Sequence, residues 1–259
     1  MFQASRLVQA SLCLLLSFYT LSSNAINLTE YRIYLDRDNR TKSFLIHNKE
    51  VEPQDCKLDL KHYNFDEKSK MTLHKSDELP ENSAKDWIRF SPKTFVLTPG
   101  QAQTIRFTLR RKAKAEPAEY RSYLQIDCGV QKHLDPEKGQ TTGNIAIKPK
   151  LMHNVPIIAR VGRLKASIDF KNLKYNNGQL TFDIERSGNR SIYGKIELID
   201  KNTNEILAFK DNISVYTEAN LNSVKLGTKD TSLTDILIRF TENKKYGGEI
   251  VYTKPAART

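Results

Sequence analysis

The sequence lacks the motifs of the common catalytic and metal-binding sites. It contains no His-Glu-x-x-His, no Gly-x-Ser-x-Gly, no phosphate-binding glycine loop and no Cys-x-x-Cys. Its histidines are isolated from one another, at His47, His62, His74, His133 and His153, and none is spaced as a metal-ligand pair. We therefore expect no enzyme activity and no cofactor.

Long apolar runs are missing after the first segment. Residues 1–25 carry one positive charge at Arg6, then a mostly apolar stretch from Leu7 to Leu21, then small residues before a cleavage point after Ala25. The stretch is short for a membrane span, so a cleaved signal peptide is the preferred interpretation and a transmembrane anchor is the alternative. We expect an exported chain that does not insert into a membrane.

Cysteine is scarce, and its placement fits export. Cys13 lies in the expected signal peptide, which leaves Cys56 and Cys128. In an oxidising compartment two thiols are expected to form one disulfide. Cys56 opens one predicted strand and Cys128 closes another, so their ends meet if the strands are antiparallel neighbours. We expect a structural bridge, with a redox function as the alternative.

The sequence has no single region to which its basic or its acidic residues are confined. The formal net charge is +11, but lysine and arginine are interleaved with acids along the predicted strands. This distribution indicates a solvated basic surface that can steer acidic partners, and we expect no nucleic-acid partner.

Short alternating runs rich in β-branched and aromatic residues fill most of the chain after residue 25. Tyr31, Ile33 and Leu35 are expected on one face of a first strand, and Phe44 and Ile46 on one face of the next. The expected strands are residues 27–35, 42–48, 56–64, 95–97, 104–109, 121–128, 144–161, 165–170, 179–185, 192–199, 206–209, 213–216, 223–226, 236–240 and 249–253. With no helical stripe among them, the pattern predicts an all-β protein built of sandwiches.

The run of residues 144–161 is unusually long and follows a polar loop. A plain core strand accounts for its later part, where Val155 and Ile157 share one parity. Ile145, Ile147 and Leu151 have the same parity but lie close to the polar loop, where a sandwich normally becomes polar. The functional interpretation is that these three side chains project into another protein, to which the backbone adds a strand.

A hinge is predicted where the strand pattern starts again. Gly162 and Arg163 follow the long run, and a second set of about seven strands begins soon after. The length suits two domains, each able to bury its own core. We place the first at residues 26–160 and the second at residues 161–259.

Four segments carry a recognisable family signature. The most specific is Trp87–Arg106, which contains Ser91-Pro92 and Leu97-Thr98-Pro99-Gly100. The other three are Pro117–Leu124, Val155–Arg160 and Arg186–Gly194. Together they resemble the PapD-like periplasmic chaperones of the chaperone–usher pathway, and the last three are similar to one divergent branch of that family. The resemblance implies two immunoglobulin-like sandwiches set at an angle and location in the periplasm.

The resemblance also implies a function. Such a chaperone stabilises pilus or fimbrial subunits by donating an edge strand, a process called donor strand complementation. It anchors the subunit's terminal carboxylate and delivers the subunit to an outer-membrane usher during pilus assembly.

One arginine and one departure matter for the anchor. Arg32 matches the family's first-strand arginine, whose forked guanidinium suits a carboxylate. The family's partner lysine on the long strand falls at Pro156 here, so Lys150 is our candidate, with Lys148, His153 and Arg160 as alternatives. Pro149 also removes one ladder hydrogen bond from the presumed donor segment.

Two other functions remain as alternatives. One is a structural or adhesive surface protein built from the same sandwiches. Such a subunit should carry its own donor extension, whereas the predicted first strand starts almost at Ile26. The other is a secreted enzyme on an immunoglobulin-like scaffold, which the absent motifs disfavour.

Overall fold

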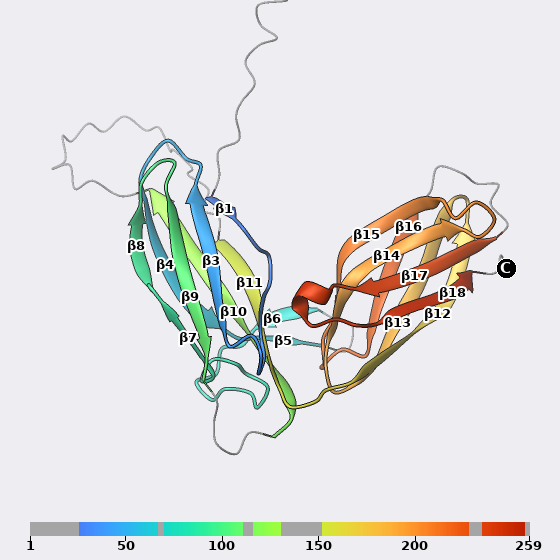
Figure 1. Cartoon of the computed structure of the whole chain (residues 1–259), viewed down its shortest axis with the longest axis horizontal. Coiled ribbons are helices and arrows are strands. Elements are labelled where there is room, and N and C mark those ends of the chain that lie inside the picture. Colours follow the sequence, from blue (N-terminus) through green and yellow to red (C-terminus); the bar gives the residue numbers. More distant parts are fainter. Residues whose placement is uncertain (1–25, 67–69, 111–115, 131–151, 228–234, 257–259) are drawn as a thin grey trace, which may run out of the picture.

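The chain folds into two β-sandwiches set at an angle, as the computed structural model shows (Figure 1). The structure describes residues 26–66, 70–110, 116–130, 152–227 and 235–256. Within these ranges there is no α-helix, and the helical content is one 3-10 turn, η1, at Lys244–Tyr246. No helical segment in the same ranges has the length and apolar character needed to cross a bilayer.

The first sandwich pairs a four-stranded sheet, β1-β3-β9-β7, with a five-stranded sheet, β2-β11-β10-β4-β8. A two-stranded ribbon, β5-β6, leaves it between β4 and β7. The strands are β1 Ile26–Leu28, β2 Ile33–Leu35, β3 Thr41–Asn48, β4 Gln54–Lys61, β5 Tyr63–Phe65, β6 Met71–Leu73, β7 Ile88–Ser91, β8 Thr94–Leu97, β9 Ala102–Leu109, β10 Ala118–Val130 and β11 Met152–Val161.

The second sandwich pairs a three-stranded sheet, β12-β13-β16, with a four-stranded sheet, β15-β14-β17-β18. Its strands are β12 Ala166–Asn176, β13 Gln179–Gly188, β14 Ile192–Asp200, β15 Ile206–Val215, β16 Leu221–Gly227, β17 Ile236–Glu242 and β18 Val251–Ala256. The two sandwiches have separate apolar cores, so the predicted all-β fold of two immunoglobulin-like sandwiches is confirmed.

Alternation explains the cores, and several expected strand faces are confirmed. Phe44 and Ile46 on β3 are fully buried, as are Ile33 and Leu35 on β2. The prediction for residues 27–35 was nevertheless wrong in one respect. The segment is two strands in different sheets, β1 and β2, and Tyr31 in the crossing between them is 70% exposed. A strand that changes sheets loses its period of two at the crossing.

A second correction concerns β15, which was expected as two strands. It is one strand of residues 206–215 whose pairing with β14 shifts between Gly194 and Ile196. Asn212 on β15 has a φ of 61°, a left-handed conformation that asparagine tolerates better than most residues. The irregular pairing breaks the alternation that the sequence pattern would otherwise have shown.

Cys56 and Cys128 form a disulfide between neighbouring strands. They are directly opposed in the antiparallel pairing of β4 with β10, and their Cα atoms are 4.1 Å apart. Cys56 is buried in the first core. The bridge therefore ties together the strands that carry the interior of the five-stranded sheet.

The connection between the sandwiches turns at Gly162, the residue that the sequence marks as a hinge. Its φ is 76°, and a Cβ there would lie 2.7 Å from the Cβ of Pro117. Both the left-handed conformation and the close approach require glycine. The expected domain boundary after residue 160 lies one residue before the end of β11.

Candidate functional site

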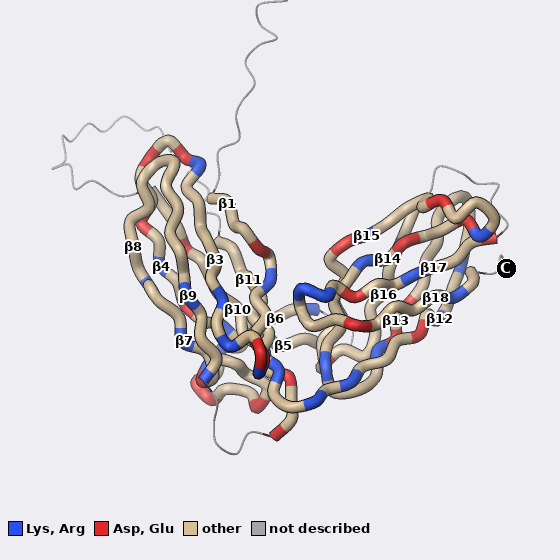
Figure 2. The backbone as a smooth tube through the Cα atoms, in the orientation of Figure 1, with Lys and Arg blue, Asp and Glu red and all other residues tan. Residues whose placement is uncertain are grey.

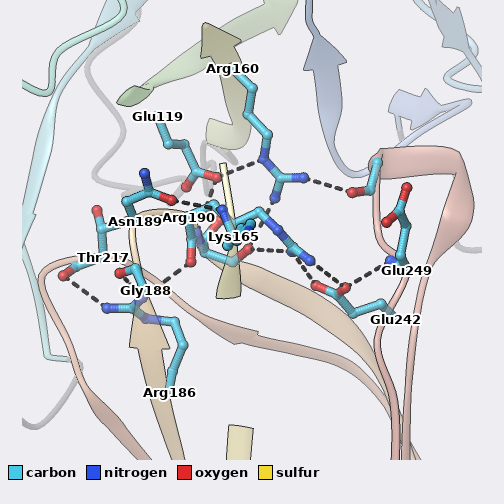
Figure 3. Close-up of polar contacts among 12 residues, drawn as sticks. Glu119, Arg160, Lys165, Arg186, Gly188, Asn189, Arg190, Thr217, Glu242 and Glu249 are labelled. Carbon is cyan, nitrogen blue, oxygen red and sulfur yellow. Dashed lines mark hydrogen bonds and ion pairs between the residues drawn. The ribbon is translucent and has the colours of Figure 1, made fainter. Parts of the chain in front are cut away.

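A buried polar network joins the two sandwiches where they meet (Figure 3). Arg160, near the end of β11, donates from Nε to Glu119 Oε2 at 2.9 Å. Its other two nitrogens donate to the carbonyl oxygens of Gly247, at 2.8 Å, and Ser191, at 3.0 Å, in the second sandwich. The Ser191 N–H donates to the same Glu119 oxygen at 3.1 Å. One arginine and one glutamate of the first sandwich therefore bind the second.

The network continues inside the second sandwich. Arg190 binds Glu242 through a two-pronged ion pair, with Nη1–Oε1 at 2.6 Å and Nη2–Oε2 at 2.9 Å. Glu242 Oε2 also accepts from the backbone N–H groups of Glu249 and Ile250 at 2.8 Å. Burial lowers the pKa of Arg190, but the bond to Glu242 outweighs it and the pKa is raised. Both charges therefore stay paired at the junction.

Arg186 on β13 holds the loop of residues 216–220, which faces the first sandwich. It donates to the carbonyl oxygens of Tyr216 at 3.2 Å and Thr217 at 3.3 Å, and to the Asn220 side chain at 3.2 Å. Figure 3 shows its guanidinium reaching Thr217 and Gly188. The loop is thereby fixed from within the second sandwich, and it carries Tyr216 and Glu218 to the junction.

Arg32, the predicted carboxylate anchor, lies at this junction directly before β2. It is 3% exposed, and its Nη2 donates to Ser214 Oγ at 2.9 Å and to the Tyr216 hydroxyl at 3.1 Å. Its guanidinium carbon lies 4.1 Å from the centroid of the Tyr193 ring. Among the described residues it has no carboxylate partner, and its buried Nε donates no hydrogen bond there.

A second buried cation, Arg121 on β10, also lies close to the Tyr216 ring. Its guanidinium carbon is 4.2 Å from the Tyr216 ring centroid, whereas that of Arg32 is 5.5 Å from it. Arg121 donates from Nη1 to Glu218 Oε2 at 2.9 Å. Burial lowers the pKa of Arg121, but the bond and the charge of Glu218 outweigh this and raise it. The two arginines differ, because Arg121 has a carboxylate partner and Arg32 has none within the described ranges.

Part of β11 is an open sheet edge within the described ranges. On one side, residues 152–161 pair with β10. On the other side, β2 pairs with only Ile157, Ile158 and Ala159. The backbone of residues 152–156 therefore has no second strand among the described residues, and such an edge is able to pair with another chain.

The pairing of β11 with β2 shows where Pro156, expected in place of the family's lysine, lies relative to Arg32. Because Ile157 pairs in parallel with Ile33, the preceding residues of the two strands are Pro156 and Arg32. Of the alternatives considered for the missing lysine, Arg160 is engaged in the junction network. Lys150 lies outside the described residues, as do Lys148, Ile145, Ile147 and Leu151.

Sequence reasoning missed Arg121 and its partner Glu218. The available signal was an arginine flanked closely by the aromatic residues Tyr120 and Tyr123 in a strand that also contains Leu124 and Ile126. A charged residue in such a position is rarely buried unless it is paired. Its partner lies 97 residues later in the chain and could not be found from spacing.

In Figure 2, basic and acidic residues are interspersed over both sandwiches, and basic residues mark the connecting segment at the bend. The candidate site consists of the charged residues that are buried where the two sandwiches meet, among them Arg32, Arg121 and Arg160.

Comparison with known proteins supports the fold. No family model matches the chain, and no curated protein matches it by sequence. The solved structure of the YadV chaperone is similar with a TM-score of 0.50 and 9% identity, covering 89% of this chain and 98% of that one. The likeness establishes the shared architecture, two β-sandwiches in one chain.

Two further solved structures are similar at lower scores. The class 5 fimbriae chaperone CfaA has a TM-score of 0.48 and 13% identity, covering 91% of this chain and 100% of that one. The SafB chaperone of Salmonella enterica, solved with the SafA pilin, has a TM-score of 0.48 and 11% identity, covering 89% of this chain and 95% of that one.

Proposed function

We propose that this chain is a periplasmic chaperone that binds pilus or fimbrial subunits, stabilises them by strand donation and delivers them to an outer-membrane usher. The observation that carries the proposal is Arg32, a buried guanidinium at the junction with neutral partners alone among the described residues. Binding, rather than catalysis, is the role of this site.

Arg32 suits a terminal carboxylate for a physical reason. Its present acceptors, Ser214 and Tyr216, are hydroxyl groups, and a carboxylate is a stronger acceptor for a guanidinium. A client carboxylate can therefore replace either hydroxyl with a gain in interaction energy. Arg121, whose charge Glu218 already balances, packs against the Tyr216 ring and helps to position it.

The open edge of β11 supports strand donation. Residues 152–156 offer backbone groups to a client, and the segment before them contains the proposed donor residues Ile145, Ile147 and Leu151. Lys150 remains our proposal for an additional anchor cation on that segment. We also propose residues 26–160 and 161–259 as the two domains, with residues 1–25 as the export signal.

The decisive experiment is co-purification from a periplasmic extract. Arg32→Ala is expected to lose the bound subunit while its far-UV circular dichroism stays that of the parent. Arg40→Ala is the matched control, because Arg40 is an exposed arginine of the same sandwich. An Arg32→Ala protein that retains its subunit in full would remove the anchor from the proposal.

Strand donation has a separate test in the same assay. Ile145→Asp and Ile147→Asp are expected to abolish subunit capture with the fold intact. If either variant instead loses the cooperative unfolding of the whole domain, these residues belong to its core and do not project into a client.

A further inference from the structure

The ribbon β5-β6 has one apolar face. Tyr63 pairs with Leu73 and Phe65 pairs with Met71. Side chains of directly opposed residues in an antiparallel pair lie on the same face, so these four share a face, and the central pair of Asn64 and Thr72 lies on the other. We call the four side chains of Tyr63, Phe65, Met71 and Leu73 the ribbon face.

Half of the ribbon face is already part of the site. The Phe65 ring lies 4.8 Å from the Tyr216 ring, centroid to centroid, and the Arg121 guanidinium carbon lies 4.6 Å from the Phe65 centroid. Tyr63 packs edge-on to Tyr123 at 4.9 Å and donates its hydroxyl to Asn154 on β11 at 3.2 Å. Figure 1 shows the ribbon between the two sandwiches.

The base of the ribbon is fixed to the strand that carries Arg121. Nδ1 of the buried His62 lies 3.2 Å from the Arg121 carbonyl oxygen, and Arg121 Nη2 donates to the Tyr63 carbonyl at 3.3 Å. His74, which follows β6 at the same end of the ribbon, donates its backbone N–H to the His62 carbonyl at 3.0 Å, and the two imidazole rings lie 5.8 Å apart, centroid to centroid. The ribbon is therefore held in place before any client arrives, which lowers the entropy lost on binding.

The other half of the ribbon face is uncovered. Met71 is 46% exposed and Leu73 is 45% exposed, although both lie on the same face as the packed Tyr63 and Phe65. β6 pairs only with β5 among the described strands. A two-stranded ribbon with an open apolar half is a surface that gains stability when another chain covers it.

We propose that the ribbon face binds apolar side chains in the last few residues of a client, directly upstream of the carboxylate that Arg32 holds. This inference rests on the proposed function. Continuity supports it, since Tyr216 touches both Phe65 and, through its hydroxyl, Arg32. An extended chain advances about 3.3 Å per residue, so a carboxylate at Arg32 leaves the preceding residues near the ribbon.

The chemistry around the ribbon selects this occupant. Arg121 contacts Phe65 on the ribbon face, and Arg32 binds Tyr216, which touches the same Phe65. A polypeptide that ends in a free carboxylate therefore fits better than the middle of a chain or a basic surface. Met71 adds an adaptable thioether side chain, which suits a site that accepts more than one apolar sequence. The ribbon thereby gives specificity for apolar carboxyl-terminal segments.

Methyl NMR tests this inference on the full mature chain. The sequence has three methionines, of which Met71 lies on the ribbon and Met152 begins β11, so methyl-labelled methionine reports on both surfaces. The probe is a short synthetic peptide of alternating threonine and valine that ends in phenylalanine with a free carboxylate. Its matched forms end in serine or in a carboxamide.

The free-acid peptide ending in phenylalanine is expected to shift the Met71 methyl resonance, and the serine form is expected to shift it far less. Met71→Ser/Leu73→Ser should weaken binding of the phenylalanine form roughly tenfold, because two half-exposed apolar side chains lose their contacts. Val251→Ser, at another exposed apolar residue on β18, is the control and should bind as the parent does.

The outcomes separate this inference from the function on which it rests. If the acid binds through Arg32 while Met71 stays unshifted and the double variant binds normally, the ribbon inference is wrong and the anchor stands. If Met71 shifts equally with acid and carboxamide and Arg32→Ala changes nothing, the ribbon contact stands and the anchor is overturned. No binding of any peptide by the parent protein overturns both.

Discussion

Glu119→Gln is expected to lower the free energy of unfolding by about 3 kcal/mol, because the buried Arg160 charge then loses its carboxylate. The side chains of Arg160 and Glu119 are 9% and 1% exposed, so solvent cannot take over the role of the lost charge. Breaking one side of such a pair costs about 3–5 kcal/mol, and the two carbonyl acceptors that Arg160 keeps favour the lower end.

The assay is urea unfolding of the mature, oxidised protein followed by far-UV circular dichroism. With a urea dependence of about 3 kcal/mol per M, the midpoint should fall by roughly 1 M. Glu116→Gln, at an exposed glutamate three residues earlier in the sequence, is the matched control and should leave the midpoint unchanged. Because the protein has two domains, the traces are also to be examined for two transitions.

A double variant distinguishes the cost of leaving one buried charge unpaired from the cost of losing the whole Glu119–Arg160 ion pair. Glu119→Gln/Arg160→Met removes both charges and should be closer in stability to the parent than Glu119→Gln alone, since no unpaired charge is left buried. The reasoning fails if Glu119→Gln costs less than about 1 kcal/mol, or if the double variant is less stable than the two single effects predict together.

Two further outcomes follow from contacts at and near the site. Burial raises the pKa of Glu218, but the bond and charge of Arg121 outweigh it, so the pKa lies below the ordinary 4.5. The stabilisation is therefore complete above about pH 4.5 and is lost as pH falls through the lowered pKa, so thermal melts of Glu218→Gln should depend less on acidity; an unchanged acid dependence contradicts this. Cys56→Ser/Cys128→Ser opens a loop with a sequence separation of 72 and should lower stability by about 4 kcal/mol in the chain-entropy account, as urea unfolding would measure. A midpoint equal to that of the oxidised parent would count against that structural role.

Much of the architecture could be predicted because the alternation of apolar and polar residues along a strand indicates which side chains are buried. Phe44 and Ile46, two residues apart, are both fully buried, and the same holds for Ile33 and Leu35. Cys56 and Cys128 each stood at the end of a predicted strand, and they are opposed in the structure. Period-two alternation needs no knowledge of distant contacts, so it could be read directly.

Alternation failed where the chain left a regular ladder. Tyr31 has the parity of Ile33 but lies in the crossing from one sheet to the other, and is exposed. The ribbon β5-β6 was only partly within an expected strand, and the extension beyond Asn64 was not expected. Three-residue strands give too few positions for a periodic pattern to be distinguished from a loop.

The order of residues alone was enough to predict an all-β chain with paired sandwiches, one pair of cysteines and an arginine, Arg32, in a strand-like context. What surrounds that arginine became known from the packing of the two sandwiches. Its partners Ser214 and Tyr216 lie 182 and 184 residues away, and the pairing of β11 with β2 places Pro156 next to it. The physical reason is that local alternation controls which face of a strand is buried, whereas the charges and acceptors that meet at a junction depend on the packing of distant segments.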